Sequence, residues 1–386
     1  MHLHPNRHIA HFDLDTFFVS VEVLKDSRLE GKPVAVGGSS DRGVIASCSY
    51  EARKFGVHAA MPVKQARYLC PELIIRQGDF ESYSKYSRDV RAVIADNTPL
   101  YEQASIDEFY IDMTGMDKFF GSLQYTDDLK KKVVKETGLP ISFALASNKL
   151  VSKIATNEYK PKAMAHIING GERQFLNPLS IIKIPGVGKE TALKLFKMGI
   201  ETVHALSSLP VEALQNLMGK HGTDLWRKAR GIDESPVIPY REQKSISTEN
   251  TFETDTINLE FLYSQLSRMT ESIAFELRSQ NKLTGCVTVK LRYSNFDTVT
   301  KQKSIPYTGQ DHLLLKTARE LFDKLFERRM LIRLIGVRFS HLVPGNYQIR
   351  LFEDTQEMIH LYQAIDSIKG QFGERLLIRG TGISFL

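Results

Sequence analysis

The sequence predicts a multidomain α+β protein. The chain has 386 residues, more than a single domain usually holds, and its 42% hydrophobic residues are enough to build packed cores. A mixed strand and helix region comes first, a helical block follows, and a second mixed block leads into a tail. Turn-rich segments at 169–171, 231–239 and 344–346 separate these parts.

Composition excludes several classes of protein. No apolar run reaches the length of a membrane span and nothing near the start resembles a secretory signal, so we expect a cytoplasmic protein without membrane contact. The three cysteines are widely spaced and lack a C-x-x-C partner, which argues against a disulfide framework and a structural zinc site. The net charge of +6 is modest, but residues 237–345 hold sixteen Lys and Arg against twelve Asp and Glu, which favours a polyanion as partner.

The first block contains two short acidic runs, at 11–18 and 104–112. Each sets carboxylates inside an apolar, β-branched and aromatic stretch that is typical of a buried strand, where ionised groups are costly unless a cation or a partner compensates them. One isolated acid would more often cap an element or pair with an arginine, but two such strands favour a metal site. Oxygen ligands suit Mg²⁺ or Mn²⁺, and Mg²⁺ usually also contacts substrate phosphates.

Strand geometry distinguishes the two runs. In an extended strand, Asp13 and Asp15 point to the same side, whereas the adjacent Asp107 and Glu108 diverge unless the chain bends there. We therefore expect the second pair at a hairpin or a strand bend.

The block from 169 to 236 is predicted to be helical. A Pro-Gly-Val-Gly turn with Gly186 and Gly188 opens a helix at Lys189, so backbone N–H groups and the helix dipole favour an anion there. The turn resembles the helix-hairpin-helix grip on the DNA backbone. The alternative is a tight helix connection without a ligand.

The block from 245 to 342 mixes strands and helices. In the strand at 287–294, apolar residues alternate with polar and basic ones, so one face is expected to be core and the other basic. The basic residues of this strand and of two later strands are Lys290, Arg292, Lys301, Lys303 and Arg338. We expect this face to lie against DNA phosphates, with a solvated charged face as the alternative.

Three motifs, at 13–18, 49–57 and 105–108, resemble the signature motifs of Y-family translesion DNA polymerases. They occur in the family's order, and the resemblance runs from about 9 to 342 and includes the helix-hairpin-helix segment. The bacterial DNA polymerase IV branch is the most similar. The resemblance implies a template-directed DNA polymerase that adds dNMP from dNTP to a primer 3′-hydroxyl by two-metal phosphoryl transfer.

The resemblance also implies a right-hand arrangement of domains. The expected parts are a palm at 1–18 and 79–168, small fingers at 19–78, a helical thumb with the helix-hairpin-helix at 169–236, a linker at 237–244, an α/β little finger at 245–342 and a tail at 343–386. Such short fingers enclose the nascent base pair loosely, so low fidelity, lesion bypass and a role in repair and damage tolerance are expected. The domains leave no room for a proofreading exonuclease.

Carried over residue by residue, the resemblance assigns the metal site. Asp13, Asp107 and Glu108 match the catalytic, metal-binding carboxylates, and the Leu14 carbonyl is expected as a further ligand. Asp15 matches the motif but not a usual ligand position, and is expected to be a structural acid that orients the strand. The cofactor is then Mg²⁺, two ions per site, with Mn²⁺ as a substitute.

The same motifs assign the nucleotide pocket. Tyr50 and Arg53 are three residues apart at the start of a predicted helix, so hydroxyl and guanidinium share a face and both reach the triphosphate. Lys160 matches a further phosphate contact. Phe18 falls at the steric-gate position, where a bulky ring leaves no room for a ribose 2′-hydroxyl. The alternative for Phe18 is a core aromatic beside Phe17.

The tail resembles a partner-binding peptide. Gln348, Leu351 and Phe352 belong to a Q-I-R-L-F run that is similar to the peptide by which bacterial polymerases attach to the sliding clamp. A short strand that packs locally is the alternative. A later apolar stripe has helical spacing, and the resemblance assigns it no role. Its members are Met358, Leu361, Tyr362, Ile365, Ile368 and Phe372.

The expected partners are therefore primer–template DNA, dNTP and the sliding clamp, bound by a monomer. Three other hypotheses remain. A non-catalytic DNA-binding clamp partner is opposed by the intact set of carboxylate and triphosphate residues. A Y-family subunit that needs accessory proteins would be inactive alone. A nucleotide cyclase with a palm-like domain has no use for the helix-hairpin-helix or the basic block.

Overall fold

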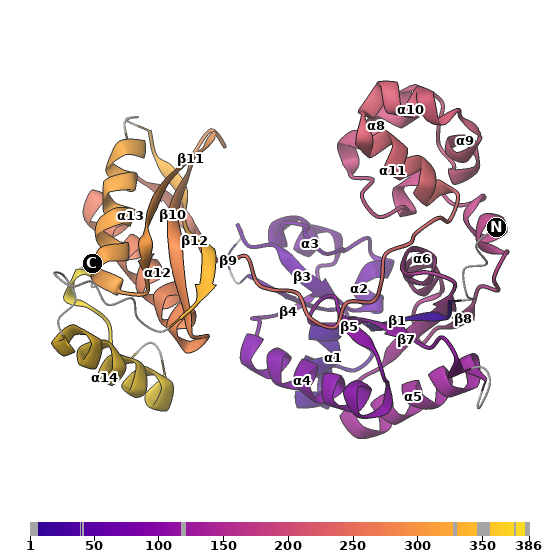
Figure 1. Cartoon of the computed structure of the whole chain (residues 1–386), viewed down its shortest axis with the longest axis horizontal. Helices are drawn as coiled ribbons and strands as arrows, with labels where there is room; N and C mark the ends of the chain where they lie inside the picture. Colours follow the sequence, from indigo (N-terminus) through magenta and orange to yellow (C-terminus); the bar gives the residue numbers. More distant parts are fainter. Residues whose placement is uncertain are drawn as a thin grey trace. The chain divides into compact units, whose positions relative to one another are not determined.

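The computed structural model divides into two compact units, Met1–Arg241 and Glu242–Leu386 (Figure 1). It describes residues 7–38, 40, 42–116, 121–326, 330–345, 356–373 and 376–382. The predicted clamp residues Gln348, Leu351 and Phe352 lie outside these ranges. Within them, no helix combines the length and apolar character that a membrane span needs.

The first unit is built on a five-stranded sheet in the order β5-β6-β1-β7-β8. Its strands are β1 (Ile9–Leu14), β5 (Tyr101–Gln103), β6 (Glu108–Asp112), β7 (Ile141–Ala146) and β8 (Met164–His166). Strand β1 is central and pairs antiparallel with both β6 and β7. Every residue of β1 is buried, and the ring of Phe12 stacks on Phe143 of β7 at 5.3 Å. The predicted acidic strand is thus the middle of a core.

Helices cover both faces of this sheet. One face packs on α4 (Phe80–Asn97) and α5 (Ser122–Thr137), in a core that includes Phe12 and Leu14. The other face, toward which His11 and Asp13 point, is covered by α6 (Lys149–Tyr159). The alternation of a strand therefore sends apolar residues to one side and polar residues to the other.

A small sheet, ordered β3-β2-β4, follows α1 in the chain. The elements of this region are α1 (Phe17–Lys25), η1 (Ser27–Leu29), β2 (Val34–Gly37), β3 (Ile45–Cys48), α2 (Tyr50–Lys54), α3 (Val63–Leu69) and β4 (Ile74–Arg76). The expected boundary between palm and fingers, after residue 18, falls inside α1. Val19 and Val21 of α1 join the same core as Phe12, and Val34 and Val36 of the small sheet belong to that core too. The helix therefore shares a core with both sheets, which the motif at 13–18 did not indicate.

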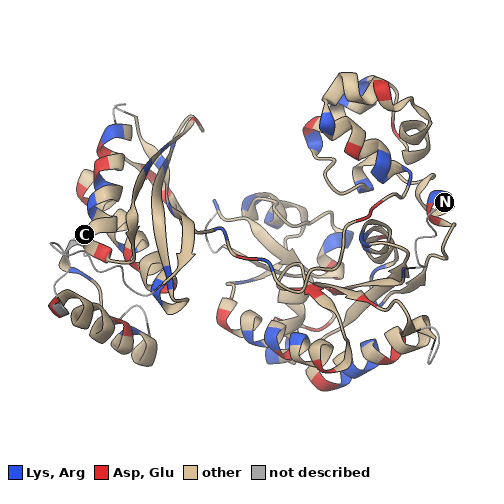
Figure 2. Ribbon diagram, in the orientation of Figure 1, with Lys and Arg blue, Asp and Glu red and all other residues tan. Residues whose placement is uncertain are grey.

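The block predicted to be helical is helical. It contains α7 (Glu172–Leu176), η3 (Ile181–Lys183), α8 (Lys189–Lys197), α9 (Val203–Ser208), α10 (Val211–Met218) and α11 (Lys220–Ala229). Leu195, Val203, Leu214 and Leu225 form its core. Lys and Arg recur along α8 and α11 (Figure 2).

The chain leaving this block is anchored on the first unit by Glu102 of β5. The buried Glu102 carboxylate accepts from the Lys149 ammonium at 2.6 Å, from the Ile238 amide at 2.9 Å and from the Arg241 guanidinium at 2.9 Å. Val237 packs on Ile9 in a small apolar cluster. The first part of the segment expected as a linker is therefore bound to the first unit.

The second unit has a four-stranded antiparallel sheet in the order β11-β10-β12-β9. Its elements are β9 (Ser245–Thr256), α12 (Leu259–Ser279), β10 (Lys282–Tyr293), β11 (Thr298–Thr308), α13 (Asp311–Leu325) and β12 (Ile332–Pro344). Val287, Val289 and Leu291 of β10 are fully buried in the core that α12 and α13 cover. The alternation predicted for this strand is confirmed.

The basic residues of this sheet do not all share one face. Lys301 and Lys303 of β11 lie opposite Val289 and Val287 of β10, so their side chains project from the helix-covered face of the sheet. On that face Lys303 pairs with Glu320 of α13 at 2.8 Å. The two lysines share a face, as the sequence predicted, but which side of the sheet that face takes is not readable from one sequence. The open face carries Lys290, Arg292 and Arg338.

The apolar stripe in the tail forms α14 (Gln356–Phe372), which packs on the second unit. Tyr362 is fully buried, and its hydroxyl lies 2.7 Å from His312 Nδ1 on α13. Arg278 of α12 bonds to Asp366 at 2.7 Å and also pairs with the buried Asp311. The last described turn, η5 (Gly380–Gly382), also contacts α12. The tail helix is therefore an integral part of this unit.

Candidate active site

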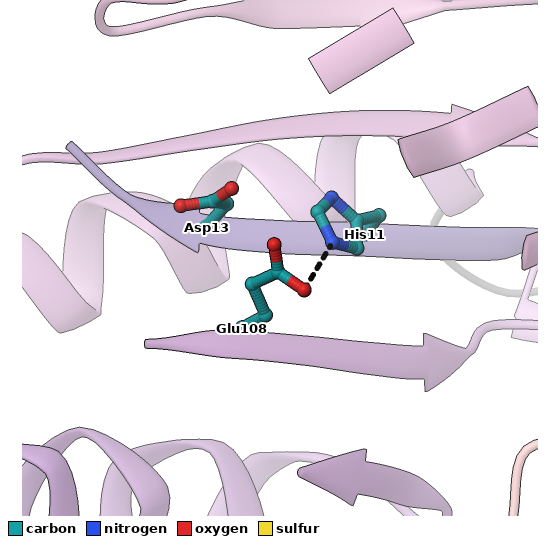
Figure 3. Close-up of side chains that lie close together, drawn as sticks. All are labelled: His11, Asp13 and Glu108. Carbon is teal, nitrogen blue, oxygen red and sulfur yellow. Dashed lines mark ion pairs between the residues drawn. The ribbon is translucent and has the colours of Figure 1, made fainter. Parts of the chain in front are cut away.

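Two carboxylates meet where β1 and β6 pair. Asp13 and Glu108 lie directly opposite each other in the antiparallel ladder, so both side chains leave the same face of the sheet. His11, two residues before Asp13, shares that face, and Figure 3 shows the three side chains close together. One ligating atom from each lies within 4.8 Å of the other two. We call these three residues the β1–β6 cluster.

The β5–β6 hairpin places Asp107 beside this cluster but outside it. The Ala104 amide closes the turn by donating to the Glu108 carbonyl at 3.0 Å. The Asp107 carboxylate accepts from the Ser105 hydroxyl at 2.6 Å, and its carbonyl accepts from the Leu14 amide at 3.1 Å. The expected bend is therefore a hairpin turn, and of the two adjacent carboxylates only Glu108 joins the cluster.

Two lysines of the α6 region neutralise the cluster. Lys160 forms an ion pair with Asp13, and the Lys153 ammonium lies 2.6 Å from Glu108 Oε2. Burial raises the pKa of Asp13 to about 6, although Lys160 opposes this effect. Burial also acts to raise the pKa of Glu108, but the neighbouring His11 and Lys153 outweigh it and lower this pKa to about 2.

The donor atoms fit a hard divalent cation. Asp13 and Glu108 supply carboxylate oxygens from facing strands, and the charge of Asp107 acts on Asp13 from the turn. Mg²⁺ binds through one or two carboxylates together with water and substrate phosphates. The raised pKa of Asp13 means that Lys160 compensates this buried charge incompletely, so a further cation beside it is favourable.

Tyr50 and Arg53 share one face of α2, as the spacing predicted. The Arg53 guanidinium lies 4.7 Å from the centre of the Tyr50 ring. Ser49 caps the helix by accepting from the Ala52 amide at 3.2 Å and also bonds to the backbone at the start of β2. Among the described residues the buried Tyr50 hydroxyl has no hydrogen-bond partner. Burial raises the pKa of Tyr50, and Asp15 adds to this, so its hydroxyl stays protonated and available as a donor.

Asp15 connects three segments of backbone and is not part of the cluster. Its carboxylate accepts from the Ser142 hydroxyl at 2.8 Å and from the Lys162 amide at 2.8 Å. The second bond holds the segment that carries Lys160 against the end of β1. These contacts support the interpretation of Asp15 as a structural acid.

Comparison with known proteins places this arrangement in a family. Residues 12–157 match the impB/mucB/samB family, residues 243–351 match the C-terminal domain of that family, and residues 182–233 match the DNA polymerase-iota thumb domain. DNA polymerase IV of Dehalococcoides mccartyi is 37% identical over 372 residues, 95% of each chain. DNA polymerase IV of Treponema denticola is 38% identical over 329 residues, 85% of this chain and 83% of its own.

A solved structure agrees with these matches. A Y-family DNA polymerase chimera of Dbh and Dpo4 superposes with a TM-score of 0.78 and 25% identity, covering 88% of this chain and 100% of its own. The chain belongs to the Y family of DNA polymerases. The resemblance noted in the three sequence motifs is thereby confirmed, as is the α+β polymerase fold.

In this Y-family chain, Phe18 belongs to an aromatic group. Its half-buried ring stacks on Tyr83 of α4, with 4.5 Å between centroids and 22° between planes, and Phe80 meets it edge-on at 5.8 Å. The Tyr83 hydroxyl donates to the buried Glu22 carboxylate at 2.8 Å. Phe17, by contrast, is 3% exposed and packs in the palm core. Phe18 packs against the same core, with its ring 5.5 Å from that of Phe17, so the two adjacent rings differ mainly in exposure.

The helix-hairpin-helix turn of this family has the predicted form. Gly186 adopts φ +99°, a conformation that favours glycine, and Gly188 directly precedes α8. A Cβ on Gly188 would meet nothing within 4 Å, so its backbone faces open space. The Lys228 ammonium of α11 bonds to the Pro185 carbonyl at 2.9 Å and supports the turn from inside.

Sequence reasoning missed two residues of the site. His11 joins the cluster, and the period-two alternation of a strand would have placed it on the same face as Asp13. Lys153 reaches Glu108 from α6, one helical turn after the Lys149 that bonds to Glu102. No motif indicated Lys153, because its role depends on how α6 crosses β1.

Proposed function

We infer that this Y-family chain is a template-directed DNA polymerase of the translesion class. It extends a primer 3′-hydroxyl with dNMP from dNTP in a metal-dependent reaction on DNA. One observation supports this inference beyond the family match. Asp13 and Glu108 lie opposite each other on adjacent strands, near the end of β1, where Asp13 also forms an ion pair with Lys160. That is the placement needed to hold cations beside a triphosphate.

Four groups are proposed to hold the metal. The carboxylates of Asp13, Asp107 and Glu108, with the Leu14 carbonyl, would bind two Mg²⁺ ions, with Mn²⁺ as a substitute. Bound ions lower the pKa of the 3′-hydroxyl and stabilise the charge on the leaving pyrophosphate. Asp15 keeps its structural role, because its oxygens already accept from Ser142 and Lys162.

The triphosphate is proposed to lie against Tyr50, Arg53 and Lys160. Arg53 offers a planar set of donors suited to phosphate, and the ring of Tyr50 supports it at 4.7 Å. The unpartnered Tyr50 hydroxyl is available as a further donor. In the structure Lys160 neutralises Asp13. When a cation takes its place beside Asp13, the Lys160 ammonium would be free to bind the phosphates. The chain thus orients the substrate and supplies fixed positive charge.

Phe18 is proposed as the steric gate of this pocket. Its stacking on Tyr83 holds the ring in one place, so a 2′-hydroxyl would meet a fixed obstacle. Among its described residues, the small region between α1 and α4 has no long helix to close over the base pair. A loosely enclosed pair fits low fidelity and tolerance of damaged templates.

DNA is proposed to be held outside the palm. Within the thumb, at 169–236, Gly186, Gly188 and Lys189 would grip a phosphate through backbone N–H groups. In the little finger, at 245–342, the open face of the sheet offers Lys290, Arg292 and Arg338. Lys290 is paired there with Glu249 at 2.8 Å, which lowers its availability to DNA.

Primer extension by the purified full chain with Mg²⁺ and single dNTPs tests the proposed site. Wild type is expected to extend undamaged and minor-groove-adducted templates, whereas Asp107→Ala is expected to lose at least about 10²-fold in rate because a cation ligand is gone. Asp128→Ala, at an exposed position on α5, serves as the control and should keep full activity. Extension by Asp107→Ala at the wild-type rate would remove Asp107 from the site, and an inactive wild type would favour the accessory-dependent subunit.

The peptide at 348–352 is proposed to bind the sliding clamp, with Gln348, Leu351 and Phe352 as its anchors. Replacing these three residues by alanine is expected to reduce clamp-stimulated processivity at least about tenfold while distributive synthesis stays unchanged, because the peptide takes no part in the reaction. Product lengths with and without clamp measure this difference. Equal loss of both activities would contradict the proposal.

A further inference from the structure

His11 is a buried histidine to which the proposed reaction assigns no role. It is fully buried on β1, with its ring 4.8 Å from that of Tyr110 and its Nε2 3.9 Å from Glu108 Oε2 (Figure 3). Among the residues that the structure describes, neither ring nitrogen has a hydrogen-bond partner. The strand alternation and the bond from the Thr156 hydroxyl to the His11 carbonyl, at 3.1 Å, fix the direction of the side chain.

An apolar residue would fill this place at lower cost. Leaving a buried donor without a partner costs about 1–3 kcal/mol, and leucine or phenylalanine in a strand core avoids that cost. The same face already holds an aromatic neighbour, Tyr110, so packing alone does not need a polar ring. The imidazole is placed where its unused nitrogen points at the carboxylate cluster.

Glu108 is held from one side only. Lys153 bonds to Glu108 Oε2 at 2.6 Å from α6, and Lys153 is partly exposed, with 28% of its side chain open to solvent. The Nε2 atom of His11 lies 3.9 Å from the same oxygen. Carboxylates that bind metals are commonly oriented by such neighbouring hydrogen-bond donors.

We propose that His11 is a positioning residue for Glu108, whose imidazole N–H holds the carboxylate in place when Glu108 exchanges Lys153 for a divalent cation. This inference rests on the proposed role of Glu108 in the metal site. It assigns the histidine no contact with the substrate. Its effect is on the affinity for the cation and reaches the reaction only through Glu108.

Mn²⁺ binding to the full chain tests the proposal apart from activity. Free Mn²⁺ is measured by electron paramagnetic resonance with the protein, dNTP and primer–template DNA whose primer ends in a dideoxynucleotide. His11→Leu is expected to bind Mn²⁺ at least about tenfold more weakly than wild type, because the donor is gone. His11→Gln, which keeps an N–H near the Nε2 position, is expected to stay within about threefold. DNA affinity should be equal in all three proteins.

The outcomes separate this proposal from the proposed function. Glu108→Gln should lose the site; if it keeps wild-type Mn²⁺ binding, the metal assignment fails. If Glu108→Gln loses binding but His11→Leu matches wild type, the positioning role alone is overturned. Equal loss in His11→Leu and His11→Gln would indicate packing and also overturn it. Should His11→Leu not fold, nitrogen-15 histidine spectra of wild type decide: an unchanged His11 ring signal on Mg²⁺ addition to the same complex refutes the proposal.

Discussion

At the scale of single residues, the adjacent Phe17 and Phe18 show how one motif gives neighbouring rings different exposure. Phe17 is 3% exposed and packs in the core of the first unit, whereas the ring of Phe18 stacks on the ring of Tyr83. Tyr83 is itself fixed by its bond to the buried Glu22. Phe17 also contacts Tyr83, at 6.2 Å, so Phe18 is distinguished by its closer stacking and its partial exposure.

Phe18→Ala is expected to retain DNA synthesis while admitting ribonucleotides. Removing the ring opens the space beside the sugar, so the preference in kcat/KM for dNTP over the matching rNTP should fall at least about tenfold. Single-nucleotide incorporation with both substrates measures this preference. Phe17→Leu is the matched control: it should lower stability by disturbing the core but leave the preference unchanged. A preference unaffected by Phe18→Ala would support the core alternative instead.

The sequence identified residues that lie inside motifs, but not residues whose role depends on contacts between separate elements. Asp13 and Glu108 were predictable because charge inside an apolar strand is anomalous. That they face each other depends on the β1–β6 register, which one sequence does not encode in readable form. Lys153 belongs to an ordinary helix, so its contact with Glu108 appears only after α6 is placed on the sheet.

At the scale of elements, the turn before α8 contains two glycines, of which only one is required by its backbone conformation. Gly186 requires glycine for its own backbone, because φ is +99° there. Gly188 has an ordinary φ of −84°, and a Cβ would meet nothing within 4 Å. Gly188 is also the N-cap of α8, where glycine is among the favoured residues, and the open space beside it leaves room for a close approach from outside.

Gly188→Ala is therefore expected to lower the melting temperature slightly, because alanine is a poorer N-cap than glycine, and to weaken DNA binding. The added methyl group would stand between the helix N-terminus and a phosphate, so affinity should fall about threefold to tenfold, uniformly across sequences, and the salt slope should fall by about one. Fluorescence anisotropy at several salt concentrations measures both. Gly199→Ala, at another open glycine of the same block, tests strain alone, since φ is +74° there. Unchanged DNA affinity in Gly188→Ala would favour a plain helix connection.

Strands were harder to assign than this turn. The alternation in β10 was predicted correctly because Val287, Val289 and Leu291 repeat with period two. The side of the sheet that Lys301 and Lys303 take was not predictable, because it depends on which β10 residue each one opposes. The side chain of a lysine on an edge strand extends to a neighbouring helix as readily as it extends into solvent. Lys303 reaches α13 in this way by pairing with Glu320.

At the scale of the whole molecule, Glu102 fixes where the connecting chain leaves the first unit. Three donors converge on one buried carboxylate, two of them from the connecting chain and one from Lys149. The division between the compact units falls after Arg241, the last of these donors. The sequence indicated a linker from its glycine and prolines but not this anchor, because Glu102 lies over a hundred residues earlier.

Glu102→Ala is expected to release this chain and destabilise the first unit by roughly 3–5 kcal/mol, because Lys149 is left buried without its partner. Urea unfolding measures the loss, and faster chymotryptic cleavage after the exposed Tyr240 reports the release. Arg241→Ala removes only the exposed donor, 67% open to solvent, and should cost no more than about 1 kcal/mol. Equal effects of the two substitutions would refute the anchor.

The central place of β1 also affects how the protein is made. β1 leaves the ribosome before its neighbours β6 and β7, which begin only at Glu108 and Ile141. All of its residues are buried in the finished sheet. Until both neighbours emerge, the nascent chain presents apolar side chains and an unpaired strand edge, the form most prone to aggregate. Yield in the cell therefore depends on quick completion of the chain through β7, which ends at Ala146, or on chaperones that cover it meanwhile.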